Sequence, residues 1–148
     1  MGGCHRGAIR YAIAGEVTVH ALCHCGDCRR HAGAPMVGWP MVPEAQLSVT
    51  GTPAVYASSE HARQKFCSAC GTDLFYTNAA MLPGLIDIQT GTLDTPEALL
   101  ATVHIQTAER LPWRATTDSL PAFDRFPIAS PAEPQSMLRF SRATHSRS

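Results

Sequence analysis

The sequence predicts a mainly β fold, an antiparallel β sandwich or partly open barrel with short helices, and three observations support this prediction. Short runs of branched and aromatic residues recur along the chain, such as "AVYAS" and "TDLFYT". Turn-forming residues separate these runs at intervals of about 8 to 12 residues, as in proteins built from antiparallel strands. Segments with helix signals are few and short. We therefore expect sheets to supply the core.

The N-terminal third is expected to contain a hairpin, a helical turn and a strand. Residues 7–13 ("GAIRYAI") alternate and predict a strand, which Gly15 turns into a second strand at residues 16–23. One helical turn is expected at residues 27–32, ended by Gly33. Residues 36–42 ("MVGWPMV") predict a strand, and Pro40 within it indicates an edge or a bulge.

The remaining segments continue the same pattern. Strands are expected at residues 46–51, 54–58, 62–67, 72–77, 84–93 and 101–107. A short helix is expected at residues 95–100, with Thr95 as its N-cap and Pro96 at its first position. Residues 128–148 are rich in Ser, Pro and Arg with few apolar residues, which predicts a disordered tail after a domain at residues 1–127.

Composition excludes several classes of protein. The formal net charge is zero and the sequence pI is near 7.0, so a basic nucleic-acid-binding surface is not expected. No apolar run approaches the roughly 18 to 20 residues of a membrane helix. The opening "MGGCHRGAIRY" lacks the apolar stretch of a signal peptide. We expect a cytoplasmic protein that binds neither nucleic acid nor membrane, in a compartment where thiols stay reduced. The sequence leaves the oligomeric state open.

The six cysteines form three groups: Cys4, then Cys23-x-Cys25-x-x-Cys28, then Cys67-x-x-Cys70. Disulfides fit a reducing compartment badly, and clustered cysteines there more often bind metal or perform redox chemistry. A C-x-x-C pair on a tight turn is half of a typical structural zinc site. The middle group offers three thiolates, and three protein ligands with one open position are typical of catalytic zinc.

Five blocks in this order resemble the family of glutathione-dependent formaldehyde-activating enzymes, which also includes centromere protein V. They are "GGCHRGAIRY", "CHCGDCRRHAGAP", "FCSACGTDLFY", "IDIQTGTLD" and "HIQTAERLPWRATTDSLPAFDRFP", and together they extend over residues 2–127. The resemblance implies an Mss4-like β fold with two zinc sites. Cys23, Cys25 and Cys28 would hold a catalytic ion. Cys4, Cys67 and Cys70 would hold a structural one.

The chain departs from the family pattern at Arg6, where the family has the second cysteine of an N-terminal C-x-C. An arginine cannot replace a thiolate ligand. Either a histidine such as His31 or His61 completes the second site, or Arg6 pairs with the remaining thiolates and the site is empty. The occupancy of the second site therefore stays open at this level.

The resemblance implies a carbon–sulfur lyase similar to S-(hydroxymethyl)glutathione synthase, with glutathione or a similar thiol and formaldehyde as substrates. Arg29 and Arg30 directly follow the third cysteine of the middle group and could bind the carboxylates of glutathione, although solvated surface charges are the plainer interpretation. For Trp113, packing in the core is expected rather than a place in the wall of a substrate site. For Asp87, a role in a turn or a helix cap is expected. Two alternatives remain, a non-catalytic zinc-binding Mss4-like module and a redox C-x-x-C protein.

Overall fold

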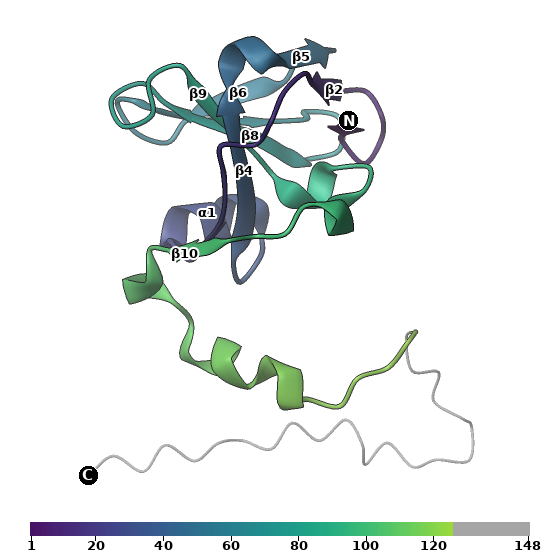
Figure 1. The fold of residues 1–148 in the computed structure, drawn as a ribbon, viewed down its shortest axis with the longest axis vertical. Coiled ribbons are helices and arrows are strands. Elements are labelled where there is room, and N and C mark those ends of the chain that lie inside the picture. The colour runs from purple at the N-terminus through teal and green to yellow at the C-terminus, as the bar shows by residue number, and fades with distance from the viewer. Residues whose placement is uncertain (126–148) are drawn as a thin grey trace. The chain divides into compact units, whose positions relative to one another are not determined.

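The structure is a computed structural model that describes residues 1–125, shown in Figure 1. Met1–Ala115 forms one compact unit, and a second unit begins at Thr116. The expected disordered tail at residues 128–148 and the expected domain end at residue 127 lie outside the described residues. No helix in residues 1–125 is long and apolar enough to cross a membrane.

The first unit is mainly β, with strands in two sheets, so the predicted fold class is confirmed. The larger sheet has seven strands in the order β10-β3-β4-β9-β8-β7-β6. Their bounds are β3 Val19–Cys23, β4 Val37–Pro43, β6 Ala54–Ala57, β7 Ala62–Phe66, β8 Asp73–Asn78, β9 Leu85–Ile88 and β10 Val103–Ile105. All neighbours in this sheet are antiparallel except β10, which pairs with β3 in parallel.

The smaller sheet shows that the predicted N-terminal hairpin is wrong. Its order is β1-β2-β5, with β1 at Gly2–Gly3, β2 at Arg10–Ile13 and β5 at Leu47–Thr50. The segment after β2 therefore enters the other sheet as β3 instead of turning back on β2. At the point where β2 ends, the Ala14 amide donates to the Gln46 carbonyl at 2.8 Å, so a distant segment takes the partner position that a hairpin would have used.

Pro40 lies inside the larger sheet, contrary to the expected edge strand. It pairs with His20 of β3, whereas β9 on the other side of β4 pairs only with Met41–Pro43. The side of Pro40 that lacks an N–H therefore faces a stretch with no strand partner. Proline is tolerated at a strand position whose N–H side has no partner strand. Pro40 satisfies this condition even though β4 as a whole is a central strand.

Helical structure is short, as predicted. The one α-helix among the described residues is α1, Gly26–Ala32, and Gly33 ends it in the left-handed conformation at φ 64°. The 3-10 helices are η1 Glu44–Gln46, η2 Thr90–Thr92, η3 Pro96–Ala98, η4 Thr107–Glu109 and η5 Pro112–Ser119. Pro96 begins η3 as predicted, but the side chain of Thr95 makes no capping hydrogen bond.

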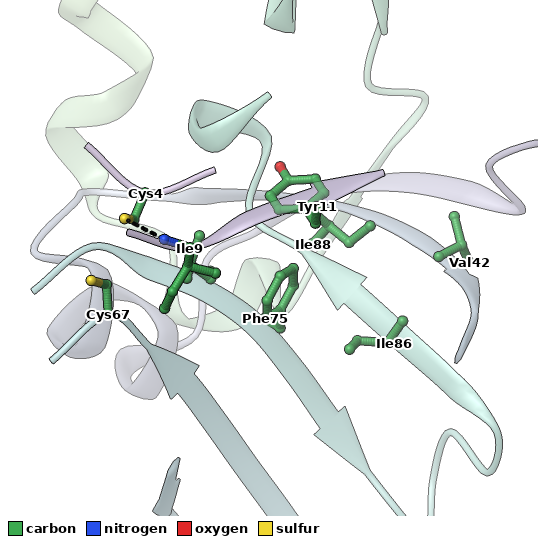
Figure 2. Packing of buried hydrophobic residues seen from close by; sticks show 9 residues of the cluster. Cys4, Ile9, Tyr11, Val42, Cys67, Phe75, Ile86 and Ile88 are labelled. Carbon is green, nitrogen blue, oxygen red and sulfur yellow. Dashed lines mark hydrogen bonds between the residues drawn. The ribbon is translucent and has the colours of Figure 1, made fainter. Parts of the chain in front are cut away.

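The main core lies between the two sheets. Figure 2 shows side chains of both sheets meeting there, with Tyr11 of β2 over Phe75 of β8. Their ring centroids are 5.2 Å apart in an edge-to-face arrangement. Ile86 and Ile88 of β9 belong to this core, and Asp87 between them points to the opposite face of the sheet. The larger sheet therefore has one face in the core and one face available to a site.

A second, smaller core lies on that opposite face. It consists of Cys23, Cys28, Val37 and Trp39, with part of Tyr76 and of the α1 region packed against it. The pairing of Cys23 with Val37 and of Ala21 with Trp39 places these residues on one side of the sheet. The sheet thus offers α1 an apolar floor at the place where the cysteines lie.

Candidate metal centres and the hollows beside them

The first cysteine triad is Cys23, Cys25 and Cys28, and its three Sγ atoms lie within 4.8 Å of one another. Cys23 ends β3, Cys25 is the N-cap of α1, and Cys28 lies in the first turn of the helix. Zinc–sulfur bonds of about 2.3 Å in a tetrahedron separate two sulfurs by about 3.8 Å. The donor set and its spacing therefore fit a zinc ion, and a fourth corner is left to another ligand.

Hydrogen bonds and burial give the three thiols of this triad different pKa values. The Cys28 amide donates to Cys25 Sγ at 3.3 Å, as an N-cap requires. The Cys28 thiol donates to Cys23, which lowers the pKa of Cys23 to about 6 against its burial, and the same bond raises the pKa of Cys28. Burial raises the pKa of Cys25. One thiolate is therefore available near neutral pH, and a bound cation would favour the ionised form of all three thiols.

Glu109 reaches the first triad from η4. Its Oε2 accepts a hydrogen bond from the Gly26 amide at 2.7 Å, so a carboxylate satisfies one of the free N–H groups at the start of α1. A side chain at position 26 would meet both this carboxylate and the Arg30 guanidinium at about van der Waals contact or closer. The small residue after Cys25 therefore admits the polar groups that surround the helix start. The sequence motif gave no sign of this contact, because Glu109 is far away in the chain.

His24, between two of the cysteines, is buried and holds two strands together. Its Nε2 lies 3.0 Å from Nδ1 of His104 on β10, and its amide donates to the Ile105 carbonyl at 3.1 Å. Burial lowers the pKa of His24. His24 is thus a neutral structural group behind the triad, and its hydrogen bonds hold the parallel edge strand β10 beside Cys23.

The second triad is Cys4, Cys67 and Cys70, whose Sγ atoms also lie within 4.8 Å of one another. Figure 2 shows Cys4 and Cys67 at one end of the main core with their sulfurs on the same side, and the Ile9 amide donates to Cys4 Sγ. Thr72 Oγ1 lies 3.2 Å from Cys70 Sγ, and this hydrogen bond lowers the pKa of Cys70 to about 6. Burial raises the pKa of Cys67.

No fourth protein ligand joins the second triad in residues 1–125. His5 and Arg6 are exposed on a turn, and the His5 amide donates to Thr72 Oγ1. His31 Nε2 lies 3.1 Å from Asp73 Oδ1, in an electrostatic contact whose angle is poor for a hydrogen bond. His61 is exposed beside Glu60. The second triad therefore offers zinc three of the four ligands of a closed structural site.

The two predicted arginines lie in α1 and line two hollows. Arg29, Arg30 and Trp113 help to line a hollow of about 430 Å³. Arg30 also lines a second hollow of about 310 Å³ with Asp27 and Gln64. Trp113 is 52% exposed, so the expectation that it packs in the core is wrong. The structure thus places both arginines at concave surface near the first triad.

Asp87 is the residue whose position sequence reasoning missed. It lies in the middle of β9, so the expected turn or cap role is wrong. It pairs with Met41 and Tyr76, on the same face of the sheet as Cys23 and Trp39. Burial, and then the charge of Cys23, raises the pKa of Asp87 to about 7. The alternation in "LIDIQ" was the signal, since a strand places Asp87 opposite its two apolar neighbours.

Comparison with known proteins identifies the family. The profile of the glutathione-dependent formaldehyde-activating enzymes matches residues 1–109, which include both triads, α1 and all ten strands described above. The chain belongs to this family. The family match confirms the resemblance found in the sequence motifs.

Two individual proteins resemble this member of the family. An uncharacterized lyase of Schizosaccharomyces pombe is 33% identical over 79 residues, which are 52% of this chain and 58% of the relative. The chain thus matches little more than half the length of that curated relative. The crystal structure of a Rhodobacter sphaeroides protein superposes with a TM-score of 0.56 at 22% identity, covering 70% of this chain and 97% of the other, and shows a shared fold.

Proposed function

We propose that the protein is a zinc-dependent carbon–sulfur lyase that reversibly condenses glutathione, or a similar thiol, with formaldehyde at the first triad. The observation that supports this most directly is the gathering of Cys23, Cys25 and Cys28 into one three-sulfur cluster with room for a fourth ligand. The family description names both substrates, and the Schizosaccharomyces pombe relative is named a lyase.

The reaction requires one bond to form and one proton to move. The thiol sulfur bonds to the formaldehyde carbon, the carbonyl π bond breaks, and the proton from sulfur ends on the new hydroxyl oxygen. A zinc ion held by the first triad would supply a place for the thiol in its nucleophilic thiolate form and would polarise the carbonyl. Cys23, Cys25 and Cys28 would be its protein ligands.

The protein's own residues contribute binding and proton transfer. Arg29 and Arg30 supply the positive charge for the carboxylates of glutathione. Asp87 faces the same side of the sheet as Cys23, and its pKa of about 7 lets it hold or release a proton near neutral pH. Val37 and Trp39 form a buried apolar floor that keeps this side of the sheet dry.

The test uses Cys25→Ser, which removes one sulfur at the partly exposed start of α1. We expect the variant to lose about one zinc per chain. Its acceleration of the exchange between glutathione and formaldehyde should be smaller than that of the native protein by a factor of at least about ten. Elemental mass spectrometry measures the zinc, and exchange NMR of the hydroxymethyl signal measures the rate.

The same experiment separates the proposal from its alternative. If the native protein binds zinc but leaves the exchange at its uncatalysed rate, the chain is a non-catalytic zinc-binding module. If Cys25→Ser keeps full zinc and full acceleration, the first triad is not the active centre.

A further inference from the structure

The hollow of Asp27, Arg30 and Gln64 has no role in the reaction described so far. Its lining is completed by His31, Tyr56 and Ser58, and its volume is about 310 Å³. Asp27 and Arg30 flank Cys28 in α1, so the hollow begins beside the first triad. A thiol ligand whose sulfur lies at the triad could therefore place another of its groups in this hollow.

Gln64 gives the hollow a buried acceptor, its Oε1, which has no hydrogen-bond partner within residues 1–125. Its side chain is 2% exposed, and no hydrogen bond reaches its Oε1 from the described part of the chain. A buried acceptor without a donor is unfavourable, and native proteins usually pair such atoms with water or a ligand. The register of β7 places Gln64 between Tyr56 and Tyr76 on the α1 side of the sheet. This position calls for a ligand that brings an N–H donor.

Two opposite charges lie on the same wall. Asp27 and Arg30 are one helical turn apart in α1, and both are exposed. Residues at this spacing commonly pair with each other, yet no ion pair joins these two in residues 1–125. His31 and Tyr56 close the hollow with stacked rings whose centroids are 6.5 Å apart. The hollow therefore presents the carboxylate of Asp27 and the guanidinium of Arg30 together, beside the Gln64 Oε1, which lacks a hydrogen-bond donor.

We infer that this hollow binds the zwitterionic amino-acid end of the substrate thiol. The α-carboxylate pairs with Arg30, and the ammonium donates to Asp27 and to Oε1 of Gln64. This inference rests on the proposed function, and it names the part of the thiol that is recognised. Glutathione has such an end in its γ-glutamyl residue, with the thiol in the middle of the molecule and a simple carboxylate at the glycine end.

The neighbouring hollow explains why two adjacent arginines are present. Arg29 and Arg30 both line that hollow, together with Leu111 and Trp113, and no acidic residue lines it. It therefore offers positive charge and apolar surface but no partner for an ammonium. The glycine end of glutathione, which has a carboxylate and no ammonium, fits this side of α1. Arg29, which lines this hollow and not the one with Asp27, then binds the glycine end, while Arg30, which lines both, binds the zwitterionic end.

The experiment measures binding of three thiols to the zinc-loaded protein by isothermal titration calorimetry. Glutathione has both ends, γ-glutamylcysteine lacks the glycine end, and N-acetylcysteinylglycine lacks the zwitterion. We expect Arg30→Gln to weaken glutathione and γ-glutamylcysteine about tenfold while N-acetylcysteinylglycine changes less than about twofold. Asp27→Asn, an exposed change that should not disturb folding, is expected to weaken the same two ligands.

Arg29→Gln is the matched comparison, because it removes the same charge one residue away. It should weaken glutathione and N-acetylcysteinylglycine and leave γ-glutamylcysteine nearly unchanged. Equal effects of Arg30→Gln on all three thiols, or no effect on any, would overturn the inference, and so would a native protein that binds none of them.

The outcomes also separate this inference from the proposed function. If the γ-glutamyl ligands depend selectively on Arg30 but formaldehyde is not condensed, the proposed function fails and the binding site stands. If condensation is accelerated and Arg30→Gln shows no ligand preference, the function stands and the recognition of the zwitterion is wrong.

Discussion

Arg6 is the residue at which this chain differs from what its family pattern predicts. Its exposed turn lies next to Cys4, and the second triad contains three sulfurs where a closed zinc site has four ligands. The first triad contains all three of the cysteines expected for a zinc site with one open position. The two triads should therefore differ in how strongly they hold zinc.

Arg6→Cys should add the missing ligand. We expect the variant to retain close to two zinc ions per chain after dialysis against a moderate chelator, whereas the native protein loses the ion of the second triad first. Elemental mass spectrometry gives the content, and cobalt substitution gives the number of thiolates from the intensity of the sulfur-to-metal absorption. Glu16→Cys is a useful control for an added thiol on an exposed position. Equal retention in the native and Arg6→Cys proteins would show that something else already completes the site.

Asp87 gives a pH dependence of definite sign. An aspartate in the unfolded chain has a pKa of about 3.9, and burial raises the pKa of Asp87 in the folded protein to about 7. The folded state therefore binds its proton more tightly, and stability falls as the pH rises from about 4 to about 7. Asp87→Asn should be as stable as the native protein at pH 4 and more stable at pH 8, by at most about 4 kcal/mol. Urea unfolding at both pH values measures this.

Asp94 supplies the control with the opposite sign. Its hydrogen bonds from Arg10 hold the pKa of Asp94 below its usual range, so this carboxylate stabilises the fold above its unfolded pKa and loses that contribution as the pH falls. Asp94→Asn should therefore lower stability at pH 8 and have no effect at low pH. A gain at pH 8 from both variants would contradict the assignment for Asp87.

At the scale of elements, α1 is a short helix whose position determines the site. It contributes Cys28 and both arginines, and Cys25 is its N-cap, yet it has only seven residues and is too short to be stable alone. Glu109 at its start, Gly33 at its end and the His31–Asp73 contact hold it on the sheet. The positions of Cys28, Arg29 and Arg30 therefore depend on these contacts.

Glu109→Gln tests the contact at the helix start. The amide oxygen can still accept from Gly26, but the negative charge near the helix N-terminus is lost, so we expect a destabilisation of about 0.5 to 1 kcal/mol. Urea unfolding measures it. Glu97→Gln on η3, an exposed change of the same kind, should stay within about 0.5 kcal/mol. Equal effects of the two substitutions would mean that the charge of Glu109 adds nothing to α1.

On the scale of the whole molecule, the second triad joins parts of the chain that belong to different sheets. Cys4 lies on the turn between β1 and β2 of the smaller sheet, and Cys67 and Cys70 lie between β7 and β8 of the larger one. The segments are more than sixty residues apart in the chain. A metal ion bound by the second triad would cross-link the two sheets at one end of the core.

Removal of metal should therefore destabilise the entire first unit. We expect a strong chelator to lower the midpoint of thermal unfolding by about 10 °C or more, since a ligand that binds only the folded state stabilises it by mass action. Differential scanning calorimetry with and without chelator measures the shift. Cys67→Ser, with one ligand of the second triad removed, should show a smaller shift on chelation than the native protein. An unchanged midpoint in the native protein would mean that neither triad holds a metal that stabilises the fold.

By itself the sequence determined the fold class, the positions of most strands, the end of α1 at Gly33 and the grouping of the cysteines. These features depend on local chemistry: alternation for strands, a left-handed glycine for the helix end, and close spacing for thiolates that share one ion. The family resemblance came from the same local motifs.

Only the tertiary structure decided which strands became neighbours, and with them the rest of the site. It sent β2 and β3 to different sheets, placed Pro40 in a central strand, turned Asp87 toward the first triad and brought Glu109 to the start of α1. It also placed Arg29 at one hollow and Arg30 at two. These contacts join residues far apart in the chain, and such pairings are chosen by the burial of whole faces, which no short stretch of sequence specifies.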